Sequence, residues 1–208
     1  YGAIGGPTGG LFASDANLSR EISQNIEFGY EVKEVYWSLK GAIYYRFDDD
    51  LVDWTYDSNN PNSRLASNVD IETFGLEIIA MRKWAKLETI ISYSHIHKEE
   101  NYKDPTIDSS FYALNYPEQR ATLGVIWKPI DYIEIRLDNE WREQRENVLR
   151  EGPDNSMYSL LAASYYPSKI DDLEIFMAYD KPWEEDFQDV PGTPGRGDQF
   201  SLGFTYSW

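Results

Sequence analysis

The feature that most constrains this chain is an alternation of apolar and polar residues that recurs from residue 21 to the end. A side-chain period of two is typical of β-strands, and helical periodicity between the repeats is weak. The pattern predicts an all-β protein of nine consecutive antiparallel strands. They are expected at Glu21–Val32, Tyr36–Phe47, Asp70–Arg82, Leu87–Lys98, Arg120–Lys128, Tyr132–Arg142, Met157–Tyr166, Leu173–Asp180 and Gln199–Trp208.

The connections between these strands alternate strictly between short and long. The short ones are Lys33–Val35, Lys83–Lys86, Pro129–Asp131 and Pro167–Asp172. The long ones, rich in Asp, Asn, Gly and Pro, are Asp48–Val69, Glu99–Gln119, Glu143–Ser156 and Lys181–Asp198. Tight turns at one end and extended loops at the other are typical of antiparallel transmembrane β-barrels of the outer membrane.

The strand expected at Tyr132–Arg142 indicates that one face of the sheet is wet. Its odd-numbered positions are mainly apolar, whereas its even-numbered positions carry Glu134, Arg136, Asp138, Glu140 and Arg142. So many charges cannot form the dry interior of a small soluble barrel, because burying unpaired charge is costly. They predict a hydrated lumen, with the apolar row facing lipid. The alternative is an open amphipathic sheet in a soluble β-sandwich.

Composition narrows the class of protein further. The 16 Tyr and 7 Trp suit an interface between apolar and wet surroundings, where such rings are enriched. A net charge of −17 argues against a nucleic-acid partner, which needs a basic surface. No apolar run approaches the roughly 18 residues of a membrane-spanning helix. The absence of Cys removes thiolate metal sites, and no metal or cofactor is expected.

The end of the chain resembles a targeting signal of outer-membrane proteins. Apolar residues alternate with small ones, and Ser201, Gly203, Tyr206 and Trp208 match the β-signal read by the barrel-assembly machinery. The resemblance implies that machinery as a partner. It also implies the bacterial outer membrane, with its lipid and lipopolysaccharide, as the surroundings of the protein.

Several further segments match one family in their order and spacing. They are Asp15–Glu21 with Ser23, Glu27 and Gly29, then Tyr44–Val52, Asn68 with Gly75–Glu77, and Tyr116–Arg120. Together they resemble the barrel of TonB-dependent receptors, which implies a 22-stranded barrel around an N-terminal plug. Nine strands would be its C-terminal part, since single-chain barrels close with an even number.

On this interpretation residues 1–20 end an extracellular loop and residues 21–208 form the C-terminal barrel strands. The plug lies outside this chain, and the other strands come from the same protein or from a second chain. The family implies uptake of a scarce nutrient such as a ferric siderophore, cobalamin, haem or an oligosaccharide. It also implies contact with the TonB complex through the plug.

Aromatic residues in the long connections are the candidate substrate-binding groups, because such rings can stack on a sugar or a planar chelate. They are Trp54, Tyr56, Tyr102, Phe111, Tyr112 and Trp183, and they could instead order the loops.

His95 and His97 share one face, where contact with lipid headgroups or solvent is favoured over a metal. The sequence shows no nucleophile paired with a base, so we do not expect an enzyme. A self-contained porin or adhesion barrel of eight to ten strands is the runner-up, and an outer-membrane hydrolase the third class.

Overall fold

The computed structural model describes residues 12–14, 18–60, 64–110, 113, 115–147, 149–170, 172–193 and 195–207. In these ranges one antiparallel sheet contains all nine predicted strands. Their bounds are β2 Ile22–Lys33, β3 Trp37–Tyr56, β4 Arg64–Lys83, β5 Leu87–Tyr102, β7 Pro117–Ile130, β8 Ile133–Gln144, β9 Asn155–Tyr165, β10 Leu173–Pro182 and β11 Gln199–Tyr206. Two short strands join them: β1, Phe12–Ser14, runs parallel to β4, and β6, Ser109–Ser110, pairs with β3.

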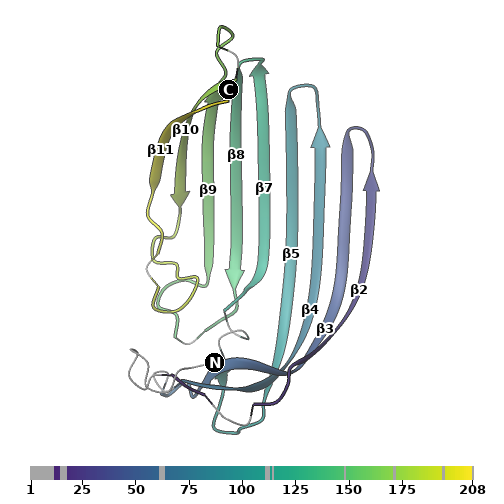
Figure 1. The fold of residues 1–208 in the computed structure, drawn as a ribbon, viewed down its shortest axis with the longest axis vertical. Helices are drawn as coiled ribbons and strands as arrows, with labels where there is room; N and C mark the ends of the chain where they lie inside the picture. Colours follow the sequence, from purple (N-terminus) through teal and green to yellow (C-terminus); the bar gives the residue numbers. More distant parts are fainter. Residues whose placement is uncertain are drawn as a thin grey trace.

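Each long strand pairs with its neighbours along the chain, in the order β11-β10-β9-β8-β7-β5-β4-β3-β2. This meander leaves β2 and β11 at the two edges of an open, curved sheet (Figure 1). The short turns and the C-terminal end of β11 lie at one end, and the long connections lie at the other. We call these the turn end and the loop end. Among the described residues no helix is long and apolar enough to cross a membrane.

The strands at the loop end are longer than the sequence predicted. β3 and β4 each contain 20 residues, so most of the expected loop Asp48–Val69 is strand. The acidic run in this region is poor in strand-forming residues, so the sequence pattern did not predict that the strand continues through it. A bulge lets it proceed, because the register shifts between Asp48 and Leu51 and Asp50 adopts a left-handed φ of 55°. A strand needs only about 9–11 residues to span a bilayer, so β3, β4 and β5 extend beyond it.

The strand register confirms the predicted division into two faces. Ile135 lies opposite Trp127 and Ala163, whereas Arg136 lies opposite Ile126 and Ala162. Large exposed apolar side chains follow the row of Ile135 across the sheet. They include Ile26, Phe28, Ile43, Ile78, Ile91, Leu123, Trp141, Leu161, Met177, Leu202 and Phe204. This row is the outward face, and the row of Arg136 is the inward face.

Buried apolar residues gather at the loop end instead of along the sheet. Val69, Ile71 and Ala113 form a core cluster against which Leu51 and Tyr102 pack. A lipid-facing sheet needs no dry interior, whereas strand extensions in water must bury their apolar groups. The core therefore forms where β3, β4 and β5 extend beyond the length that spans a bilayer, and it holds the loop end together.

Candidate functional site: the lumen wall and the loop end

The five charged residues predicted to face the lumen lie on the inward face of β8. Arg136 Nε is 2.5 Å from Asp138 Oδ2, and Lys128 Nζ of β7 is 2.9 Å from Glu134 Oε2. The side chain of Arg136 is 55% exposed, so its ion pair contributes at most about 1 kcal/mol. Such exposed, mutually neutralised pairs suit a wall in contact with water.

The charged row continues toward the loop end. Glu140 accepts from Arg120 Nη2 of β7 at 2.5 Å and lies 3.4 Å from Arg142 Nε. Arg142 also pairs with Asp189, and its guanidinium carbon lies 5.2 Å from the ring centre of Phe187. The lumen wall is thereby tied to the connection between β10 and β11.

A cavity of about 380 Å³ opens on the inward face where β3, β4 and β5 approach the loop end. Its apolar floor is formed by Leu51, Ile71 and Ile96. Arg46 and Asp48 line it as an ion pair, with 2.8 Å between Nη2 and Oδ1. Lys98 also lines the cavity, so two cationic side chains and one carboxylate surround its apolar floor.

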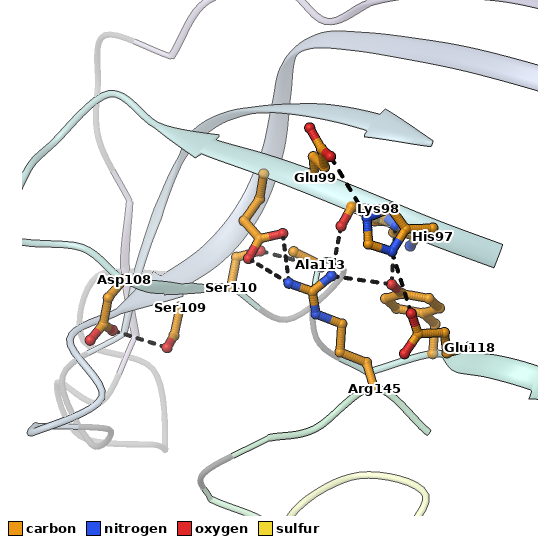
Figure 2. A network of polar contacts seen from close by, with 11 residues as sticks. His97, Lys98, Glu99, Asp108, Ser109, Ser110, Ala113, Glu118 and Arg145 are labelled. Atoms are coloured by element: carbon orange, nitrogen blue, oxygen red, sulfur yellow. Dashed lines mark hydrogen bonds and ion pairs between the residues drawn. The ribbon is translucent and has the colours of Figure 1, made fainter. Parts of the chain in front are cut away.

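Figure 2 shows a polar network at the loop end that is organised by Arg145. Arg145 Nη1 donates to the Lys98 carbonyl at 2.6 Å, and Nη2 donates to Glu100 Oε1 at 3.2 Å. The Tyr116 hydroxyl accepts from the Lys98 amide at 3.1 Å and lies 3.5 Å from Arg145 Nη1. The network joins the end of β5 to the connections before β7 and after β8. No sequence pattern marked Arg145, because its partners are distant along the chain.

Tyr56 and Tyr102 are packing residues of the loop end. Tyr56 is 4% exposed, and the Arg64 guanidinium carbon lies 5.4 Å from its ring centre. Tyr102 packs on the core cluster, and burial raises the pKa of both phenols. Their predicted role in substrate stacking stays a prediction, and this burial favours the alternative in which they order the loops.

Trp54 and Trp183 lie apart from one another. Trp54 is half-buried on β3 opposite Ala66. Trp183 is 56% exposed and donates from Nε1 to Ser159 Oγ at 3.0 Å, so it lies beside the outward row of β9. An indole at this edge suits the interfacial aromatic belt of a membrane protein. Phe111 and Tyr112 lie outside the described residues.

Both histidines lie in the outward row, as their spacing predicted. His95 is opposite Leu76 and Gln119, and His97 Nδ1 is 3.4 Å from Glu118 Oε1. In the described part of the chain no group of three or more His, Cys, Asp or Glu is placed to hold a metal ion.

The segments that matched family motifs meet at the bulge of β3. Asn68 Nδ2 donates to the Asp50 carbonyl at 2.6 Å, and Asn68 Oδ1 accepts from the Ser19 amide at 2.7 Å. The Val52 amide donates to Glu21 Oε1 at 2.9 Å. Residues 19–21, 50–52 and 68 are thus one structural unit, which fixes the chain where β3 leaves the barrel wall.

The residues of the predicted assembly signal lie on the edge strand β11. Ser201 and Gly203 belong to its inward row and Tyr206 to its outward row, while Trp208 lies outside the described residues. Gly203 is opposite Phe176, and a Cβ at Gly203 would lie 2.6 Å from Phe176 Cζ. An alanine here would require the ring of Phe176 to move.

Comparison with known proteins identifies this architecture. Several solved structures share the fold, at sequence identities too low to indicate more, and three of them illustrate the match. The FrpB iron transporter from Neisseria meningitidis (F3-3 variant) has a TM-score of 0.68 at 17% identity, over 94% of this chain and 32% of its own. The copper transporter OprC has a TM-score of 0.69 at 16% identity, and the match covers 93% of this chain and 32% of OprC. OmpT of Vibrio cholerae has a TM-score of 0.52 at 12% identity, and the match covers 89% of this chain and 56% of OmpT.

The chain thus spans about a third of the length of the two transporters. A search of curated protein sequences found no match. Residues 1–173 match the family described as "TonB dependent receptor-like, beta-barrel", whose members lie in the bacterial outer membrane. Because that match covers most of the sequence, the chain belongs to the TonB-dependent receptor β-barrel family.

Proposed function

We propose that this chain is the C-terminal part of a receptor that takes up a scarce nutrient across the outer membrane. The observation that carries the proposal is the sidedness of the sheet, which has an apolar outward row and charged pairs such as Arg136–Asp138 inward. The loop end is the extracellular side, with residues 1–20 ending an external loop and residues 21–208 forming barrel strands. The other strands, a plug and its contact with the TonB complex belong to the rest of the protein.

Among the possible substrates, we favour a chelate of iron or copper. The two transporters with the same fold are named for iron and for copper, which favours metal chelates over cobalamin, haem and oligosaccharides. The cavity beside Arg46 and Lys98 gives the wall an opening that could take part of such a ligand. Lipid, lipopolysaccharide and the barrel-assembly machinery remain the proposed partners of the outward face and of β11.

Uptake tests this proposal directly. The complete receptor would be expressed in a host that lacks its own chelate receptors, and cells would be supplied with radioactive iron as a ferric hydroxamate or ferric citrate. We expect receptor-dependent accumulation that is abolished when the host lacks TonB. Equal accumulation with and without TonB would contradict the proposal and would favour passive passage through a porin.

A further inference from the structure

The outward face carries a groove near the turn end, where β8, β9, β10 and β11 lie side by side. Its volume is about 220 Å³. The outward side chains that line it are Ile133, Ala163, Tyr165, Ile175, Met177 and Leu202. We call this hollow the Ala163 groove.

The small side chain of Ala163 causes the hollow. In the strand register Ala163 lies between Ile135 of β8 and Met177 of β10. Leu161 and Tyr165 precede and follow it on the same face of β9, because alternate residues of a strand share a face. Leu161 is 52% exposed and Met177 is 48% exposed, so large side chains project around a single methyl group.

One end of the groove is polar. The rings of Tyr132 and Tyr165 meet edge to face at the turn end, with 6.2 Å between their centres. Ala163 is two residues from Tyr165, a distance of about 7 Å along the strand. Tyrosine hydroxyls are enriched where a bilayer meets water. The groove therefore leads from an apolar floor to the tyrosines of the interface.

The surroundings of the outward face determine what can fill this groove. The family lies in the outer membrane, so the outward row meets hydrocarbon chains. An unfilled hollow loses the dispersion contacts of its walls, and a flexible chain can restore them. With the loop end outside, the turn end faces the periplasmic leaflet, which consists of phospholipids.

We propose that the Ala163 groove is a binding site for one acyl chain of a phospholipid, whose headgroup lies beside Tyr132 and Tyr165. This lipid stays on the barrel longer than the lipids around it. The inference rests on the orientation given under the proposed function, with the loop end outside the cell.

Photolabelling of the complete receptor tests the inference. The receptor would be placed in phosphatidylethanolamine vesicles that contain a trace of the same lipid with a diazirine in one acyl chain. Met177 would be compared with Ile91, an outward residue that is likewise the fifth of its strand from the turn end. We expect about tenfold more modification at Met177, as a bound chain requires. Equal modification would show ordinary lipid contact only and would overturn the proposal.

Filling the groove is the second test. Ala163→Phe should lower the modification of Met177 to the level of Ile91, because the ring occupies the place of the chain. Ala121→Phe is the control, since Ala121 lies in the outward row between Tyr93 and Trp141. Unchanged preference for Met177 in the Ala163 variant would contradict the site. Lipopolysaccharide instead of phospholipid on the receptor purified from cells, lost in the Ala163 variant, would overturn the assigned occupant.

The outcomes separate this inference from the proposed function, because photolabelling needs no transport. A receptor that is modified preferentially at Met177 but takes up no chelate would keep the groove and lose the function. A receptor that takes up a chelate and is modified evenly would lose only the groove.

Discussion

The ring of Tyr44 on β3 lies over Gly75 on β4, its partner in the strand register. A Cβ at Gly75 would lie 2.0 Å from Tyr44 Cζ, which is far inside a van der Waals contact. The Gly-x-Glu segment that matched the receptor family thus has a packing explanation. Phe176 and Gly203 repeat the arrangement on β10 and β11. In both pairs the glycine leaves room for an aromatic ring on the inward face.

Gly75→Ala should destabilise the barrel by about 1–3 kcal/mol, because the added methyl group displaces the Tyr44 ring from a packed position. The loss would be measured as a lower urea midpoint of the refolded full-length protein. Gly41→Ala is the control, since its Cβ would meet no atom closer than 3.6 Å. The double variant Gly75→Ala/Tyr44→Ala should recover part of the loss. A double variant with no recovery would show that Tyr44 is not the cause.

Gly203→Ala should reduce the amount of folded receptor in the outer membrane, as measured by heat-dependent mobility on a gel. Two causes can be separated. If the methyl group clashes with Phe176, then Phe176→Ala in the same protein should restore assembly. If instead the barrel-assembly machinery reads the glycine itself, assembly would stay low in the double variant and the packing explanation would be lost.

Asn68→Ala should loosen the bulge of β3, because it removes the hydrogen bonds to the Asp50 carbonyl and from the Ser19 amide. The expected cost is about 1–2 kcal/mol, visible as faster hydrogen exchange of residues 50–52. Asn101→Ala, at an exposed position of β5, serves as the control. Unchanged exchange at residues 50–52 in the Asn68 variant would refute the role of this side chain.

Arg145→Gln should release the two connections that its guanidinium joins. Charge-assisted hydrogen bonds of this kind contribute about 1.5–3 kcal/mol, so protease cleavage between residues 103 and 116 should become faster. Arg196→Gln is the comparison, because Arg196 stands over the Tyr158 ring with 5.5 Å to its centre. Identical cleavage of both variants would mean that Arg145 does not hold the loop.

Acid should open the contact between residues 57–60 and Asp108. Hydrogen bonds from Ser58 hold the pKa of Asp108 below its ordinary value. A carboxyl group whose pKa is lower in the folded than in the unfolded protein stabilises the fold, and this contribution is complete above the unfolded pKa of about 3.9. The contribution is lost as the pH falls through the lower pKa of the folded protein. The protection factor of the Ser58 amide, which is its exchange rate corrected for the intrinsic effect of pH, should thus fall below about pH 4. Asp108→Asn should show fast exchange already at neutral pH, and a wild-type profile in this variant would exclude the mechanism.

Period-two alternation was enough to predict all nine long strands, their antiparallel order and the two faces, because side-chain parity follows directly from the strand backbone. The same parity placed the five charged residues from Glu134 to Arg142 on one face of β8, and their contact with a hydrated lumen stays a prediction. Alternation could not predict how far β3 and β4 run, since the bulge at Asp50 shifts parity within an acidic segment.

Only the tertiary structure decided which loop residues pack and which stay accessible. Tyr56 and Trp183 looked equivalent in sequence, yet one is buried at the loop end and the other lies beside the outward row. Ile78 and Ile79 are also adjacent, yet Ile78 lies opposite Gly41 and Tyr93, whereas Ile79 lies opposite Lys40 and Ser92. Local alternation fixes the face of a side chain, but its neighbours on that face come from other strands and connections, and their contacts exist only once the sheet has formed.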